Sequence, residues 1–137
     1  MALDIKKVEY YNFTVGDHAG EGAKLLSLFA AAGVNLLAFK TVHREPGRTQ
    51  FTLFPNDGLR MIAGAKKAGL EWDGPHAALL IKDTDESGAL ADIYERLSQA
   101  DIAVHESSGI ADINGGYGVV LYLEQEDCDK AAAALEM

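Results

Sequence analysis

The sequence of 137 residues has a single cysteine, Cys128, and no long apolar run. One thiol excludes an internal disulfide and a cluster of cysteine metal ligands. A membrane-spanning helix needs about 18 consecutive apolar residues, and no stretch approaches that length. Residues 1–7 also lack the basic-then-apolar layout of a signal peptide. We therefore expect a cytoplasmic protein in a reducing compartment, without a membrane partner.

Basic residues are scarce as well. The chain has 12 Lys and Arg against 21 Asp and Glu, and its formal net charge is −9. Nucleic-acid affinity depends on clustered Lys and Arg that neutralise phosphates. Here the basic residues are scattered, so the composition argues against DNA, RNA or an anionic membrane as the main partner.

Catalytic and metal-binding patterns are missing too. No nucleophile stands in a recognisable arrangement with a base, and the four histidines are spread too widely in sequence to suggest a metal site. The acidic run 83–86 lacks the spacing of a calcium loop. Asn114-Gly115-Gly116 is typical of a hairpin turn rather than a phosphate loop. We expect no enzyme activity, no cofactor and no metal.

The middle of the chain contains a strand, a glycine turn and a helix start. Ala77–Ile81 is an apolar run of strand length, and turn-forming residues follow at 83–88. The helix face that comes next consists of Leu90, Ile93, Tyr94 and Leu97. The first turn of a helix has N–H groups without intrahelical partners, so it favours a carboxylate or phosphate. Alternatively, Asp85 or Ser87 caps this helix.

The same order of elements occurs twice. In the first half we expect strands at 8–15, 34–43 and 49–54 and helices at 21–32 and 59–68. In the second half we expect strands at 70–72, 77–82, 102–110 and 117–123, a break at 73–75, and helices at 89–100 and from about 127. At a shift of 68 residues the halves align without a gap, with Gly88 on Gly20 and Asp85 on Asp17. We infer an ancient duplication with repeats 2–69 and 70–137.

Each repeat reads as strand–helix–strand–strand–helix, preceded by a short strand. This order is typical of an α+β, ferredoxin-like βαββαβ unit, in which an antiparallel sheet carries two helices on one face. Leu70–Trp72 suits the fourth strand of repeat one. Repeat two has no such strand left, so we expect residues 2–6 to close its sheet. A core of this size is marginal alone, so we expect the halves to pair.

Two segments resemble the ACT domain, a small regulatory module that senses amino acids in biosynthetic enzymes. They are Gly88-Ala89-Leu90-Ala91-Asp92-Ile93 and Ile102-Ala103-Val104-His105-Glu106-Ser107. They are similar to the Gly-Ala-Leu helix start and the Glu-Ser-Arg-Pro strand end of the regulatory domains of prephenate dehydratase and aromatic amino-acid hydroxylases. Repeat one resembles the general ACT pattern, with Asp17-x-x-Gly20 and Gly33-Val34-Asn35. The resemblance implies a free-standing tandem ACT regulator.

The resemblance also implies an amino-acid ligand at the seam between two ACT repeats. It thereby marks as ligand-binding residues Asp17, His18, Ala19, Gly20, Asn35, Asp85, Ser87, Gly88 and Glu106. Free helix N–H groups suit the α-carboxylate, and Asp17 or the Asn35 carbonyl suits the α-ammonium. The residues themselves leave open whether the aspartates cap their helices and whether Asn35 only shapes a turn. They also leave open whether Glu106 lies on the exposed side of an edge strand.

The sequence departs from the ACT pattern at several positions. Ser108 and Gly109 stand where the pattern has arginine and proline, Ala103 where repeat one has Asn35, and Ala19 where many such loops have proline. We expect a regulatory protein that binds an amino acid, forms a homodimer and acts on an enzyme or regulator partner. The alternative is a structural or protein-interaction module with a decayed ligand site, which the departures in repeat two favour. An enzyme on the same scaffold is a third hypothesis.

Deletion of residues 2–6 tests the proposed closure of the second sheet. Their removal exposes a sheet edge, so it should lower the midpoint of thermal unfolding by several degrees. Circular dichroism against temperature, on the full and the truncated chain, measures the change. An unchanged midpoint would show that these residues complete no sheet.

Overall fold

A computed structural model describes residues 3–83, 88–113 and 115–136. The chain divides into two compact units. The first unit is Glu9–His76, and the second unit consists of Met1–Val8 together with Ala77–Met137. The strands β1 (Leu3–Gly16) and β4 (Asp73–Asp83) each contribute residues to both units. Among the described residues, no helix has the length and apolar character of a membrane span.

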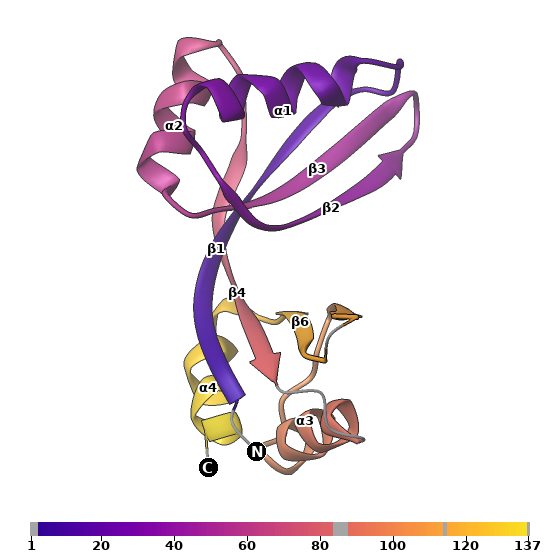
Figure 1. Cartoon of the computed structure of the whole chain (residues 1–137), viewed down its shortest axis with the longest axis vertical. Coiled ribbons are helices and arrows are strands. Elements are labelled where there is room, and N and C mark those ends of the chain that lie inside the picture. Colours follow the sequence, from indigo (N-terminus) through magenta and orange to yellow (C-terminus); the bar gives the residue numbers. More distant parts are fainter. Residues whose placement is uncertain (1–2, 84–87, 114, 137) are drawn as a thin grey trace. The chain divides into compact units, whose positions relative to one another are not determined.

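The first unit is a sheet with two helices on one face (Figure 1). Its strand order is β2-β3-β1-β4, and β3 runs antiparallel to both β1 and β2. Its remaining elements are α1 (Glu21–Ala31), β2 (Leu36–Arg44), β3 (Arg48–Pro55) and α2 (Gly58–Lys67). Together these elements form one βαββαβ unit.

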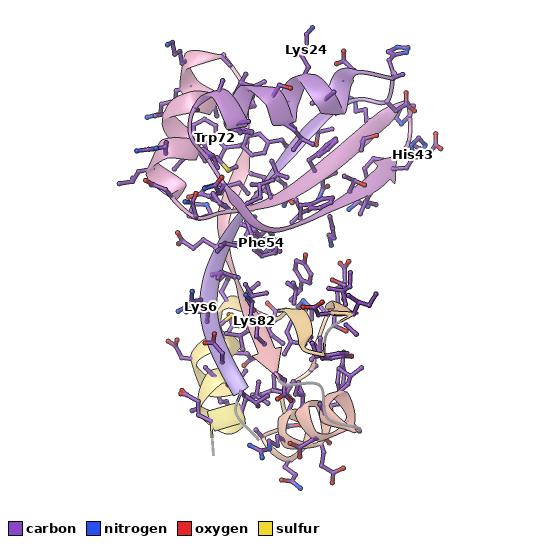
Figure 2. All side chains as sticks on the ribbon, viewed as in Figure 1. Lys6, Lys24, His43, Phe54, Trp72 and Lys82 are labelled. Atoms are coloured by element: carbon purple, nitrogen blue, oxygen red, sulfur yellow. The ribbon has the colours of Figure 1, made fainter. Side chains whose placement is uncertain are left out.

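Alternation along the strands separates the two faces of this sheet. On the helix side, Phe13 of β1 packs against Phe29 of α1, with ring centroids 5.0 Å apart. Trp72 lies against the same core, whereas Phe54 lies on the opposite face (Figure 2). The buried residues of this core are Tyr11, Phe13, Leu25, Phe29, Val34, Phe51, Leu53, Met61 and Ala65.

The second unit has the same architecture. Its strand order is β1-β4-β6-β5, and β6 runs antiparallel to β4 and β5. Its other elements are α3 (Ala89–Gln99), β5 (Glu106–Ala111), β6 (Tyr117–Tyr122), a 3-10 turn (Gln125–Asp127) and α4 (Cys128–Glu136). Its largest buried side chains come from the sheet and both helices and include Leu79, Ile81, Ile93, Leu97, Leu121 and Leu135. The predicted α+β class with two βαββαβ units is confirmed.

The shift of 68 residues holds in the structure for most elements. The bounds of α1 and α3 differ by this number at both ends. The cross-strand pair Tyr11–Leu53 likewise corresponds to Leu79–Leu121. The last helix differs, because α2 begins at residue 58 and α4 at residue 128. The 3-10 turn lengthens the connection after β6, so the expected gap-free alignment is wrong for the last helix.

The start of β1 belongs to the second unit. Leu3 and Ile5 pack against the buried core of that unit. Lys7 Nζ lies 3.2 Å from a carboxylate oxygen of Asp129 in α4. This part of β1 lies next to β4, which is the position we expected for residues 2–6. Residue 2 itself lies outside the described residues.

The connection between the repeats differs from our expectation. Leu70–Trp72 forms no strand, and Asp73–Pro75, expected as a break, begins β4. In the first unit this part of β4 is an edge strand, and an edge strand tolerates a proline because one N–H position can stay unpaired. Gly74 allows a close approach to β1, since a Cβ there would lie 2.9 Å from the Tyr10 carbonyl oxygen. Glycine and proline therefore mark an edge strand rather than a break.

Replacing Gly74 by alanine should destabilise the first unit. The φ of Gly74 is 137°, and the new Cβ meets the Tyr10 carbonyl. We expect a loss of about 2–4 kcal/mol of unfolding free energy, from backbone strain and crowding together. Urea denaturation at constant temperature measures the loss.

Gly69→Ala is the matched control. The φ of Gly69 is 72°, but a Cβ there meets no atom of the described residues within 4 Å. Its expected cost is about 1–2 kcal/mol from the left-handed conformation alone. Equal losses in the two variants would contradict the close approach at Gly74.

Candidate functional site

The turn between β1 and α1 presents free backbone donors. Residues 17–20 of this turn are all exposed. Gly20 is the N-cap of α1 with φ 96°, and no side chain within the described parts of the chain caps the helix. The N–H groups of Gly22 and Ala23 have no hydrogen bond to another described residue. Such N–H groups at a helix start favour a carboxylate.

Asp17 does not act as the helix cap. One of its carboxylate oxygens lies 3.7 Å from Nδ1 of His43, which Figure 2 shows at the hairpin end of β2. The Asp17 N–H donates to the Gly47 carbonyl at 3.0 Å, so the hairpin holds the turn in place. His43 Nε2 also lies 3.1 Å from Glu45 Oε1. Sequence reasoning missed His43 as a neighbour of this turn, because the register of the hairpin brings it there.

The start of α1 packs directly on the sheet. A Cβ on Gly22 would lie 2.6 Å from the ring of Phe51, so the helix approaches β3 closely at this point. The His18 carbonyl accepts a hydrogen bond from the Glu21 N–H at 3.1 Å, which closes the turn. The exposed side chains of His18 and Ala19 leave the turn open toward solvent.

Asn35 lies at the opposite end of α1 from this turn. The helix has 11 residues, so its ends are roughly 16 Å apart. Both β1 and β2 run antiparallel to β3 and are thus parallel to each other. Asp17 follows β1 and Asn35 precedes β2, so the two residues lie at opposite ends of the sheet. Within one unit, the structure does not bring Asn35 together with residues 17–20.

The backbone of Asn35 is fixed, and its side chain is exposed. Its N–H donates to Asn56 Oδ1 at 3.0 Å, and the Asn56 N–H donates to the Asn35 carbonyl at 2.8 Å. These bonds join the start of β2 to the end of β3 without using the Asn35 amide side chain. The side-chain amide therefore stands at the start of an edge strand, where another molecule can reach it.

The second unit has the same helix start. Gly88 is the N-cap of α3 with φ 87°, and no described side chain caps this helix. Asp85 and Ser87 lie outside the described residues. Glu106 is exposed at the start of β5, so it lies at the far end of α3 from Gly88. Gly88 and Glu106 are the two predicted site residues of this repeat that the structure describes. It does not bring them together.

A polar network lies on the helix-free face of the first unit. Thr52 Oγ1 donates to Asn12 Oδ1 at 2.6 Å, and Asn12 Nδ2 donates to Asp73 Oδ2 at 3.0 Å. His76 Nε2 lies 3.0 Å from the same Asp73 oxygen. The hydrogen bonds from Asn12 and then from His76 hold the pKa of Asp73 below its ordinary value of 3.8. We missed this network because we expected a break at Asp73.

The described residues include no cluster of metal ligands, and the thiol of Cys128 is buried. Within residues 3–83, 88–113 and 115–136, no three His, Cys, Asp or Glu side chains gather as metal ligands. Cys128 is buried, and desolvation raises the pKa of its thiol. Because the thiolate is the reactive form, burial and the raised pKa both disfavour reaction at this cysteine.

Comparisons with known proteins define the fold. No family model and no curated protein matches this sequence. The crystal structure of protein BT0572 from Bacteroides thetaiotaomicron is similar, with a TM-score of 0.82 and 16% identity over 96% of this chain and 88% of that chain. The ligand-free regulatory subunit of aspartate kinase from Thermus thermophilus has a TM-score of 0.67 and 15% identity over 98% and 93%. The corresponding subunit from Thermus flavus has a TM-score of 0.66 and 13% identity over 98% and 94%. The protein thus shares the fold of aspartate kinase regulatory subunits.

The ionisation of Asp73 should contribute to stability in a pH-dependent way. Its pKa is lower in the folded chain, so the contribution is present above pH 3.8 and is lost as the pH falls through the folded pKa. The side chain is 68% exposed, so we expect at most about 1 kcal/mol. Urea denaturation of the native chain and of Asp73→Asn should show a difference at pH 7 that decreases as the pH is lowered below 3.8. A difference that persists unchanged at the lower pH would contradict this role.

Proposed function

We propose that this protein is an ACT-type regulator that binds a free amino acid and does not catalyse a reaction. The observation that carries the proposal is the uncapped start of α1 behind Gly20, with its free N–H groups. An α-carboxylate matches these donors in charge and in geometry. The fold shared with aspartate kinase regulatory subunits along most of the chain supports the same class of protein.

In this proposal the turn of repeat one holds the two charged groups of the ligand. The α-carboxylate accepts hydrogen bonds from the N–H groups of Gly22 and Ala23. The α-ammonium pairs with Asp17, which its hydrogen bond to Gly47 keeps beside the helix start. His43 is a weak partner of Asp17, because both side chains are at least one-third exposed, so the ammonium competes with it at low cost.

Asn35 completes the site from a second copy of the chain. β2 is an edge strand of the first unit, and its Leu37 and Phe39 side chains are 45% and 65% exposed. Two β2 strands that pair antiparallel about a two-fold axis bury these side chains. Such pairing places Asn35 of one copy beside the hairpin end of β2, and so beside Asp17, of the other. A homodimer therefore unites residues that one unit keeps roughly 16 Å apart.

The second candidate function is a protein-interaction module without a ligand. β5 is exposed along its whole length, and an edge strand of this kind can accept a strand from a partner. Ala103 occupies the position in repeat two that Asn35 occupies in repeat one. The two candidates differ in whether any amino acid stabilises the protein.

A thermal-unfolding screen against the twenty amino acids separates the candidates. A ligand at 100 times its Kd adds about 2.7 kcal/mol of stability, which moves the midpoint by several degrees. We expect a shift with one chemically related group of amino acids, and its loss in Asp17→Ala and in Asn35→Ala. Asp57→Ala, which removes the cap of α2, is the control variant that keeps the shift. No shift with any amino acid, in a folded protein, would favour the interaction module.

A mixing experiment tests whether the site is shared between copies. Asp17→Ala and Asn35→Ala chains each form dimers with two defective sites. A mixed dimer contains one site with both residues intact and one site that lacks both. Calorimetric titration of the mixture, after exchange of subunits, should recover binding with about one quarter of the native sites filled. If the mixture binds no more ligand than either variant alone, the site is not shared in this way.

A further inference from the structure

The helix-free face of the second unit has a gap over a glycine of its sheet. Lys82 of β4, Gly118 of β6 and Ile110 of β5 form one row across the three strands. Neighbouring residues of a strand point to opposite faces. The row therefore lies on the face opposite to Ile81 and Val119, which belong to the core beneath the helices. Because Gly118 has no side chain, it leaves a gap between the side chains of Lys82 and Ile110.

A cavity of about 530 Å³ lies at this gap, and its volume is within the range of small-molecule sites. Its described lining residues belong to β4, β5, β6 and the hairpin between β5 and β6, and no described helix contributes. Ile110 and Ile113 on the β5 side are 78% and 96% exposed. The carboxylate of Asp83 takes no part, because its position in β4 directs it to the opposite face. The cavity thus has a cationic wall on β4 and an aliphatic wall on the β5 side.

The ammonium of Lys82 is available to a ligand. The residue is exposed, and its side chain has no ion pair within the described part of the chain. Water satisfies an ordinary surface ammonium, so the feature that distinguishes Lys82 is the apolar hollow beside it. A ligand that fills this hollow brings a negative charge to the ammonium and removes apolar surface from water at the same time.

Repeat one has a different pair of side chains at the corresponding place. At the shift of 68 residues, Gly118 corresponds to Gln50 and Lys82 to Thr14, and these two residues pair across β1 and β3. The side-chain oxygen of Gln50 accepts a hydrogen bond from Arg44 Nε at 3.3 Å. A glutamine side chain therefore stands in repeat one where repeat two has the gap. The lysine and the glycine are features of repeat two.

We propose that this cavity binds a monocarboxylate with an aliphatic chain. The carboxylate accepts hydrogen bonds from the Lys82 ammonium, and the chain lies over Gly118 against Ile110 and Ile113. Asp112 lies on the β5 side of the cavity, away from Lys82, so it repels a second carboxylate and disfavours a dicarboxylate. The site uses none of the residues before α1, and it stands independently of the proposed function.

The chemistry of the walls favours a carboxylate over a phosphate. Phosphate sites combine several donors, such as backbone N–H groups at a helix start or in a nest. Here Lys82 is the only Lys or Arg among the described lining residues, and no described helix begins at the cavity. One ammonium beside an aliphatic wall matches a single charge on an apolar chain.

The binding test adds 4-methylpentanoate to the labelled full chain and follows the backbone amide resonances. We expect saturable shifts of residues 110–113 and 116–118. The neutral analogue 4-methylpentan-1-ol should bind about five- to tenfold more weakly, because it lacks the charge-assisted hydrogen bond. The dicarboxylate glutarate should also bind more weakly. Absence of saturable shifts, or equal binding of 4-methylpentanoate and either of the other two compounds, would overturn the proposal.

Two substitutions change the charge and the hollow separately. Lys82→Gln removes the ammonium, so it should weaken binding of 4-methylpentanoate about five- to tenfold and leave binding of the alcohol unchanged. Gly118→Gln introduces the residue of repeat one and fills the gap, so it should abolish binding of both compounds. The fold should tolerate this change, because a Cβ on Gly118 meets the Ile110 carbonyl oxygen at 4.0 Å, an ordinary contact.

Lys24→Gln is the matched control for the charge. It removes one positive charge from α1 of the first unit (Figure 2) and should leave the Kd unchanged. An equal loss of affinity in Lys24→Gln and Lys82→Gln, or unchanged binding in a folded Gly118→Gln variant, would overturn the proposal. Asp17→Ala should also leave binding of 4-methylpentanoate unchanged. Failure of this site and failure of the amino-acid site are therefore distinguishable.

Discussion

Both units depend on one constraint. In each unit one long strand, β1 or β4, needs a further strand beside it, because its edge would otherwise be exposed. Each repeat supplies three strands of its own unit, and the fourth strand comes from the start of the other repeat's long strand. The C-terminal part of β1 serves the first unit, while its N-terminal part, Leu3–Val8, serves the second. In β4, Asp73–His76 serves the first unit and Ala77–Asp83 the second. Each unit thereby reaches four strands and a core that it could not complete with its own repeat.

The duplication has kept the features that the fold requires and has changed the chemistry around them. Gly20 and Gly88 both adopt the left-handed conformation that a turn into the helix needs, with φ 96° and 87°. The surrounding side chains differ, because Asp17 pairs with His43 in repeat one, whereas Ala111 takes the place of His43 in repeat two. Two units with one architecture therefore differ in the side chains at corresponding positions near the helix start.

Much of the fold was predictable from the sequence, because helical periodicity and turn glycines act locally. The helix expected at 21–32 ends at Ala31, and the helix expected at 89–100 ends at Gln99. The start of β4 was not predictable in this way, since glycine and proline suggest a break unless the strand is known to be an edge. We missed that α4 begins two residues later than the shift of 68 predicts. The alanines of this helix fit both the predicted and the observed alignment.

The candidate site was predictable only in part. The free helix start at residues 17–22 follows from local sequence, whereas the contact of His43 with Asp17 depends on hairpin register. Asn35 and the turn were expected to share one ligand site at a seam between repeats, and α1 separates the two within one unit.

The most direct test of the account is an amide-resolved NMR titration of the labelled protein with the amino acid that stabilises it most. We predict that the amides of residues 17–22 and of residues 33–36 shift together, with one apparent Kd. These two segments lie at opposite ends of α1, so a single ligand can affect both directly only across two copies of the chain. Shifts confined to one of the two segments, or no saturable shifts at all, would contradict the shared amino-acid site.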